Sequence, residues 1–173
     1  MMKIKSEKGM SLLEILVVIA VFAILGILVT RSVILTLQGV KKTESLIRAR
    51  ENLDYSLGII ERQLRNASAV PQCPNINPLV INYLNQNGNP ASFSCINPGG
   101  IDSFVASGSG TPVTSVNLTT NTVNIVSCTF MCTPSTNATP PVVNISLGVQ
   151  DALATGIQGS IVTADTQISL RNY

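Results

Sequence analysis

A single apolar segment near the N-terminus constrains this chain more than any other feature. Residues 10–30 read MSLLEILVVIAVFAILGILVT and carry one charged side chain, Glu14. A helix needs about 20 apolar residues to cross the hydrocarbon core of a bilayer, so this run is just long enough to span a membrane. Arg31 then ends the uncharged run. The sequence therefore predicts a transmembrane helix half over residues 10–31.

The charges before this segment predict its orientation. Lys3, Lys5 and Lys8 precede it, with Glu7 among them. Cytoplasmic flanks of spanning helices carry an excess of Lys and Arg, so we expect the remainder of the chain to be translocated. The apolar run is too long for an ordinary secretory signal peptide and lacks a small-residue cleavage site at its far end. An uncleaved signal anchor is the plain alternative.

Helical periodicity continues beyond the apolar segment. An apolar stripe advances in alternating steps of three and four residues, which predicts an amphipathic helix half over residues 32–70. Its members are Leu46, Ala49, Leu53, Leu57, Ile60, Leu64 and Ala67. Charged residues occupy the opposite positions, and Glu44 and Arg48 are spaced to form a supporting pair. No proline interrupts residues 11–69, so we expect Pro71 to end one continuous helix of roughly 85–90 Å.

Residues 71–173 have the pattern of a β-rich head, with short strands between turn signals. The candidate strands are Leu79–Leu84, Ser92–Ile96, Ser103–Ala106, Val113–Leu118, Val123–Met131, Val142–Val149 and Gln167–Leu170. Both faces of Val123–Met131 are partly apolar, which predicts an internal strand. Asn87-Gly88 is a hairpin turn signal. The helix stripe can cover the apolar face of a small antiparallel sheet, so the expected fold class is α+β.

Four cysteines lie after the apolar segment, at Cys73, Cys95, Cys128 and Cys132. If this part is exported, an oxidising compartment favours disulfides. The chain has no histidine, and the spacing does not match a paired zinc-binding pattern. Our preferred pairs are Cys73–Cys95, around the expected hairpin, and Cys128–Cys132. The second pair requires a turn after Phe130, because cysteines four apart in a straight strand lie roughly 13 Å apart.

The composition of the head argues against nucleic-acid binding and catalysis. Beyond Val70 the only basic side chain is Arg171, which makes a poor partner for phosphate backbones. The acids Asp102, Asp151 and Asp165 are scattered without a motif, and no Gly-rich phosphate loop follows a strand. We expect no enzyme activity, no cofactor and no metal.

The position of Glu14 is the observation closest to function. An acid near the start of a spanning helix is costly, and such acids usually have a specific partner. A suitable partner is a new α-amino group, created by cleavage between Gly9 and Met10. In a staggered stack of parallel helices, Glu14 of one subunit can neutralise the N-terminus of the next. The alternative is that Glu14 extends toward the lipid headgroups at the start of a signal anchor.

This pattern resembles the type III signal of prepilins, which type IV pilins and type II secretion pseudopilins share. The family has a basic leader ending in Gly, a hydrophobic new N-terminus and a Glu four residues on; Gly9, Met10 and Glu14 match in place. The family commonly has Phe where this chain has Met10. The resemblance covers roughly residues 3–69. It implies that residues 1–9 are a leader, that a membrane aspartyl peptidase cuts after Gly9, and that Met10 is then N-methylated.

The resemblance also implies partners and a location. The partners would be the prepilin peptidase, other pilin or pseudopilin subunits, membrane lipid before assembly and, indirectly, an inner-membrane assembly platform with its ATPase. The head would be extracytoplasmic on a single-pass inner-membrane helix, and later part of a filament outside or in the periplasm. Major pilins often carry a proline near the position of Arg31 and a cysteine pair at the C-terminus, which this chain lacks.

We therefore expect a minor, priming subunit, weakly similar to J-type pseudopilins in TQISLRN at 166–172. The residues leave pilus and pseudopilus open. Two other functions stay open as well: a membrane-anchored extracytoplasmic binding domain with an uncleaved anchor, and a subunit of a DNA-uptake pilus.

Overall fold

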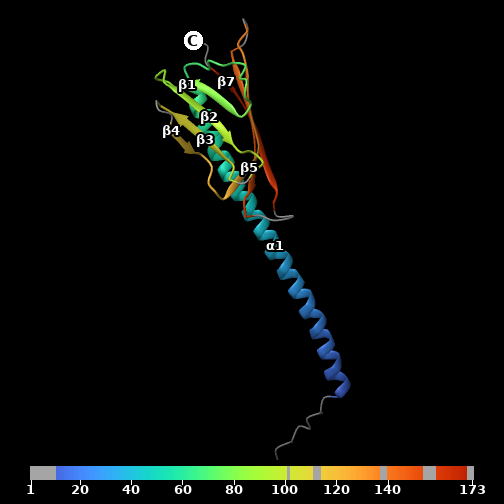
Figure 1. Ribbon diagram of the computed structural model, residues 1–173. Coiled ribbons are helices and arrows are strands. Elements are labelled where there is room, and N and C mark those ends of the chain that lie inside the picture. Colours follow the sequence, from blue (N-terminus) through green and yellow to red (C-terminus); the bar gives the residue numbers. More distant parts are fainter. Residues whose placement is uncertain (1–10, 101, 111–113, 137–139, 154–158, 171–173) are drawn as a thin grey trace, which may run out of the picture. The chain divides into compact units, whose positions relative to one another are not determined.

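The computed structural model describes residues 11–100, 102–110, 114–136, 140–153 and 159–170 (Figure 1). Its internal packing divides the chain into two compact units, Met1–Val40 and Lys41–Tyr173. Each unit is described by itself below.

One helix, α1, extends from Leu12 to Arg65 and contributes to both units. The carbonyl of Ser11 accepts the N–H groups of Glu14 at 2.9 Å and Ile15 at 3.3 Å, which makes Ser11 the residue before the first turn. Serine is a favoured residue at that position. Arg62 and Arg65 lie in the last turn, where cations complement the helix dipole.

The helix ends at Arg65, five residues before the expected Val70. The N–H of Ser68 donates to the carbonyl of Leu84 at 2.9 Å, and the N–H of Leu84 donates to the carbonyl of Ala69 at 2.8 Å. These bonds form a short antiparallel bridge. Because these bonds hold the non-helical backbone of residues 68–69 against Leu84, tertiary pairing ends the helix before Pro71 can.

In the described part of the head, seven antiparallel strands follow, and they form two sheets where the sequence suggested one. The first sheet has the order β1-β2-β3-β4, and the second has the order β5-β6-β7. The strands are β1 Val80–Leu84, β2 Pro90–Ile96, β3 Phe104–Ser109, β4 Thr114–Asn117, β5 Val123–Thr133, β6 Val142–Asp151 and β7 Ile161–Ser169. The expected α+β class is confirmed, and each predicted strand overlaps an observed one.

Strand β5 lies at the edge of the second sheet, so the predicted internal position is wrong. Its apolar residues on both faces come from a β-bulge: Ile125 pairs with Val149 and Ser127 with Gly148, which leaves Val126 unpaired. One extra residue reverses the alternation of a strand. Val123 and Ile125 are therefore buried before the bulge, and Cys128, Phe130 and Cys132 after it.

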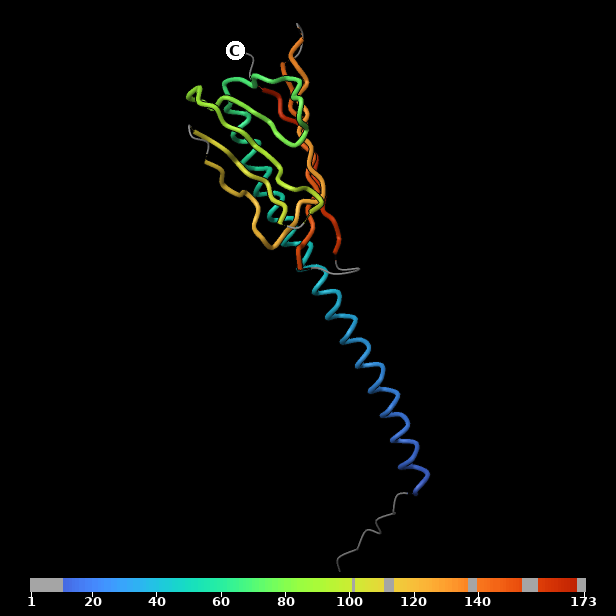
Figure 2. Tube along the Cα trace, viewed as in Figure 1, coloured from blue at the N-terminus to red at the C-terminus, as the bar shows by residue number. Residues whose placement is uncertain are grey.

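The core of the second unit joins the helix stripe to both sheets. Ala49, Leu53, Leu57, Ile60 and Leu64 of α1 are buried, as the periodicity predicted. Figure 2 shows the last turns of α1 running beside the strands β1–β4. A single buried cluster includes these helix residues and inward-facing residues of β1, β2, β3, β5, β6 and β7. They include Ile81, Phe93, Val105, Ile125, Phe130, Ile145, Leu147 and Ile168.

The predicted hairpin joins β1 to β2 through residues 85–89. Gly88 has φ +77°, a region that glycine adopts without a steric penalty. The side-chain oxygen of Asn85 accepts the N–H groups of Asn87 at 2.9 Å and Asn89 at 3.0 Å. The loop is thus longer than the two-residue turn that Asn-Gly most strongly signals.

Both predicted disulfide pairs, Cys73–Cys95 and Cys128–Cys132, are wrong. The structure joins Cys73 to Cys132, with Cα atoms 5.2 Å apart, and Cys95 to Cys128, with Cα atoms 6.4 Å apart. Strand β5 continues straight to Thr133 and does not turn after Phe130. Cys128 and Cys132 therefore share the inner face of β5 and reach two different partners across the core.

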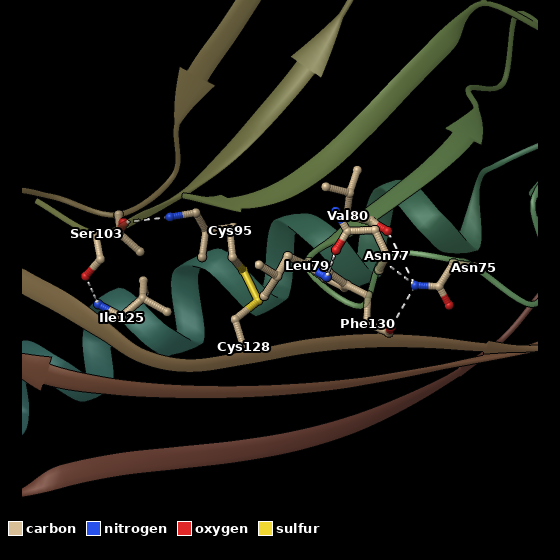
Figure 3. The surroundings of a disulfide bond; sticks show 11 residues. Asn75, Asn77, Leu79, Val80, Cys95, Ser103, Ile125, Cys128 and Phe130 are labelled. Atoms are coloured by element: carbon tan, nitrogen blue, oxygen red, sulfur yellow. Dashed lines mark hydrogen bonds between the residues drawn. A yellow bond between two sulfur atoms is a disulfide. The ribbon is translucent and has the colours of Figure 1, made fainter. Parts of the chain in front are cut away.

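Loops from the first half of the head cover the outer edge of β5 (Figure 3). The Ser103 hydroxyl accepts the N–H of Ile125 at 2.7 Å, and the Pro78 carbonyl accepts that of Phe130 at 2.7 Å. The Asn75 side chain donates to the Phe130 carbonyl at 2.8 Å and accepts the N–H of Cys132 at 2.9 Å. This edge is therefore paired, which prevents it from pairing with another chain.

Candidate functional site

The exposed apolar part of α1 is the first component of the candidate site. Every residue from Ser11 to Glu44 is exposed, including Leu12 at 81% and Phe22 at 75%. The most apolar window of 18 residues has a mean hydropathy of 3.1, and none of that window is buried. By length and composition this helix can cross a membrane. An apolar surface of this extent requires lipid or protein around it.

The backbone groups and two threonine hydroxyls of this segment form hydrogen bonds within the helix, as a lipid environment requires. An α-helix satisfies its own backbone groups, which an irregular segment in lipid cannot do. The hydroxyl of Thr30 donates to the carbonyl of Gly26 at 2.7 Å, and the hydroxyl of Thr36 donates to the carbonyl of Ser32 at 2.9 Å. These polar side chains therefore need no hydrogen-bond partner outside the helix.

Glu14 is the polar exception in the apolar segment. It lies in the first turn of α1 and is exposed. Within the part of the chain that the structure describes, its carboxylate has no hydrogen-bond or ion-pair partner. The N-terminus of a helix favours a negative charge, but the dipole supplies only part of what the carboxylate loses on leaving water. A positive group from outside the described residues can supply the rest.

The other predicted site residues have different outcomes. Gly9 and Met10 lie outside the described residues. All four cysteines form disulfides, so none has a free thiolate for a metal. Among the residues that the structure describes, no group of three or more His, Cys, Asp or Glu side chains comes together.

Sequence reasoning missed the ion pair that links the helix to the second sheet. The guanidinium of Arg48 donates to one oxygen of Asp151 at 3.1 Å and 2.9 Å. The backbone N–H of Leu153 donates to the other oxygen at 2.9 Å. The Glu44–Arg48 pair that the spacing predicted is also present, at 3.2 Å.

Opposing effects determine the pKa of Asp151. Burial alone would raise the pKa of its carboxyl, since only 1% of the side chain is exposed. The Leu153 N–H, the Arg48 guanidinium and the Ser45 hydroxyl stabilise the charged form, and together they hold the pKa below its ordinary value. A sequence signal existed, because Asp151 continues the inward-facing alternation of Val143, Ile145, Leu147 and Val149 in β6.

Comparison with known proteins identifies the N-terminal segment. A family model described as the prokaryotic N-terminal methylation motif matches residues 4–30. This range contains Gly9, Met10 and Glu14 and most of the exposed apolar helix. No curated protein and no solved structure matches the chain at a significant level. The chain thus carries a type IV prepilin-like signal, while the match does not extend to the head.

Proposed function

We propose that this chain, which carries the prokaryotic N-terminal methylation motif on an exposed apolar helix, is a structural subunit of a type IV pilus or a type II secretion pseudopilus. The match at residues 4–30 is the observation that carries this proposal. A helix long enough to span a membrane and a disulfide-linked β-rich head support it. The role is that of a building block, and the proposal requires no cofactor.

The proposed processing begins at the leader. A prepilin peptidase cuts after Gly9 and releases residues 1–9, and Met10 is then N-methylated. Removal of Lys3, Lys5, Lys8 and Glu7 leaves a formally neutral chain. The α-amino group of Met10 becomes the only charge that cleavage adds at this end of the helix.

In the filament, Glu14 of one subunit pairs with the amino group of Met10 in a neighbour. The charge pair offsets the cost of removing each ion from water, which is several kcal/mol per ion in an apolar medium. The absence of a partner for Glu14 among the described residues fits this role. Before assembly, lipid surrounds the exposed apolar residues of α1.

The cell location follows from charge and processing. The lysines before the apolar segment keep that end in the cytoplasm, so the head is extracytoplasmic on a single-pass inner-membrane helix. An assembly platform and its ATPase then extract the subunit into a filament. We further propose a minor, priming role, because no proline lies near Arg31 and no cysteine pair encloses the C-terminus.

The N-terminus of the purified protein provides the decisive test. Mass spectrometry of the mature chain should find an N-methylated Met10 and no residues 1–9. An intact Met1 would contradict processing and favour the uncleaved membrane anchor.

A matched pair of variants sharpens this test. Gly9→Val should retain the leader, because the peptidase site leaves no room for a side chain. Gly26→Val makes the same substitution in the same segment, where an added Cβ meets no atom within 4 Å. Its leader should therefore be removed normally. Normal cleavage of both variants would show that Gly9 is not the cleavage determinant.

A further inference from the structure

A polar pocket in the head has no role in the proposed assembly. It lies between the last turns of α1 and the sheet of β1–β4, and its volume is about 340 Å³. Small-molecule sites begin at about this volume. The lining residues are Arg62, Gln63, Asn66, Tyr83, Asn85, Gln86, Ala91, Ser107 and Ser109. Apart from Ala91 and the ring of Tyr83, these side chains are polar.

Arg62 gives the pocket its charge. Glu61, the neighbouring acid, contacts Arg65 at 3.8 Å and accepts the hydroxyl of Thr166 at 2.6 Å. Among the described residues, Arg62 forms no ion pair, and no acid lines the pocket. A cation in the last turn complements the helix dipole, but this does not explain why the pocket around it lacks an acid.

Two amides of the pocket have their oxygens already occupied. The oxygen of Asn85 accepts two backbone N–H groups of the hairpin loop, at 2.9 Å and 3.0 Å. The oxygen of Gln63 accepts the hydroxyl of Tyr83. Burial raises the pKa of Tyr83 to about 12, so this hydroxyl remains a donor. Each amide therefore keeps its NH₂ group for another acceptor.

The remaining polar groups of the pocket also have spare hydrogen-bonding capacity. In the part of the chain that the structure describes, the side chains of Asn66, Gln86, Ser107 and Ser109 make no hydrogen bond with one another or with other groups. Together with Arg62, Gln63 and Asn85, they form a concave surface with more donors than acceptors. Its complement is a ligand that carries one negative charge and several oxygens.

We propose that this pocket binds an acidic saccharide unit, a uronic acid, with its carboxylate on Arg62 and its hydroxyl and ring oxygens on the surrounding amides and serines. A guanidinium matches the geometry of a carboxylate and can donate to both oxygens. A phosphate dianion would keep uncompensated charge beside a single cation. The neutral amides and hydroxyls of the pocket outnumber its one charged group, Arg62. A ligand with many hydroxyl groups needs this excess of neutral hydrogen-bonding partners.

The affinity should be modest. Tyr83 cannot offer its ring face to a sugar, because it is buried and stacks on Phe93 with ring centroids 5.2 Å apart. Without an aromatic surface, binding depends on hydrogen bonds that compete with water. We expect a Kd on the order of 1–10 mM for one saccharide unit.

The test uses the full chain in detergent micelles and ligand-observed NMR. Trigalacturonate should show saturation transfer from the protein, whereas a neutral trisaccharide and inorganic phosphate should show much less. Arg62→Gln should raise the Kd of trigalacturonate about tenfold or more, because a charge-assisted hydrogen bond is lost. Arg50→Gln makes the same charge change at an exposed position of the same helix, outside the pocket, and should leave the Kd within about twofold.

A second pair separates the pocket from general surface binding. Gln86→Ala removes a lining amide and should weaken binding about threefold to tenfold. Gln167→Ala removes an exposed glutamine of β7 and should have no effect.

Four outcomes would overturn the proposal: no transfer to trigalacturonate, equal transfer to the neutral sugar, tighter binding of phosphate, or equal loss in Arg62→Gln and Arg50→Gln. The measurement needs no filament, so its failure leaves the proposed assembly function standing.

Discussion

At the residue scale, Arg48 contacts two acids in different environments. Asp151 is buried, with 1% of its side chain exposed, whereas 62% of the Glu44 side chain is exposed. Exposed pairs contribute little, because water and salt screen them. A buried carboxylate that loses its charge leaves donors without a strong acceptor. The two acids therefore provide an internal comparison within one cluster.

Asp151→Asn should destabilise the head by about 1–3 kcal/mol, whereas Glu44→Gln should change its stability by no more than about 0.5 kcal/mol. Urea unfolding of the full chain in detergent, followed by circular dichroism, measures both. Equal effects of the two variants would contradict the assigned role of burial.

The dependence of the head's stability on pH should also report the ionisation of the Asp151 carboxylate. The pKa of Asp151 in the folded protein lies below its ordinary value of 3.8, so on acidification the unfolded chain binds the proton first. Its stabilising contribution is fully present above the ordinary value and is lost as the pH falls through the folded pKa. Wild type should lose more stability than Asp151→Asn as the pH falls from 5 to about 2. Equal losses of stability in wild type and in Asp151→Asn would show that other carboxylates determine the acid sensitivity.

Glu14 is the second residue whose role can be isolated. Glu14→Gln should insert into the membrane and lose its leader normally, but it should enter filaments less efficiently by on the order of tenfold, because the neighbour's amino group is left unpaired. Glu51→Gln is the control, since it neutralises an exposed acid on the same helix beyond the apolar segment. Quantifying both variants in sheared filaments gives the comparison. Normal incorporation of Glu14→Gln would exclude the carboxylate as an assembly contact.

At the element scale, local periodicity explains α1 well and β5 poorly. The helix stripe follows from the 3.6-residue period, which is local in sequence, so the prediction that Ala49, Leu53 and Leu64 are buried is confirmed. The end of the helix depends on Leu84, which is distant in sequence and holds the backbone of residues 68–69. No local pattern contains that information.

The bulge in β5 explains the errors in that strand. Val126 interrupts the alternation, so a strand with one buried face looks apolar on both. The same bulge places Cys128 and Cys132 on the buried face together with Phe130. The cysteine pairing followed from this nonlocal geometry and could not be derived from spacing. At the candidate site, a local pattern singled out Glu14, whose role stays a prediction. Asp151 continues the alternation of β6, but its partner Arg48 is 103 residues away in sequence, so no local pattern predicts the ion pair.

Disulfide mapping checks the pairing directly. Digestion without reduction should yield peptides that link Cys73 to Cys132 and Cys95 to Cys128. The double variants Cys73→Ser/Cys132→Ser and Cys95→Ser/Cys128→Ser should each lose about 3–4 kcal/mol of stability and keep the other bond. A linked peptide containing Cys73 and Cys95 would contradict the structure.

At the scale of the whole molecule, charge is unevenly distributed along the chain. Beyond Lys8, all the basic residues lie between Arg31 and Arg65, except Arg171. The strands carry acids and uncharged polar residues, so contacts of the head with neighbours should depend on shape and hydrogen bonds more than on long-range attraction. This fits a subunit whose position in a filament is determined by a specific docking surface.

If the subunit primes assembly, its loss should reduce the number of filaments and leave their diameter unchanged. Electron microscopy of a deletion strain measures both. Quantitative mass spectrometry of sheared filaments should find the chain at low copy number. Dominance of this chain in the filament would make the minor role wrong and leave the filament-subunit proposal intact.

The Cys73–Cys132 bond has a mechanical consequence. It joins residues that are 59 positions apart in sequence and 5.2 Å apart in space. A tensile load applied between the two ends of the chain cannot straighten the segment between them while the bond is intact. Fully extended, that segment would add about 200 Å of contour. In single-molecule pulling, the oxidised protein should therefore be shorter than the reduced one by about this length, because the tension passes through the disulfide and bypasses the segment that it encloses.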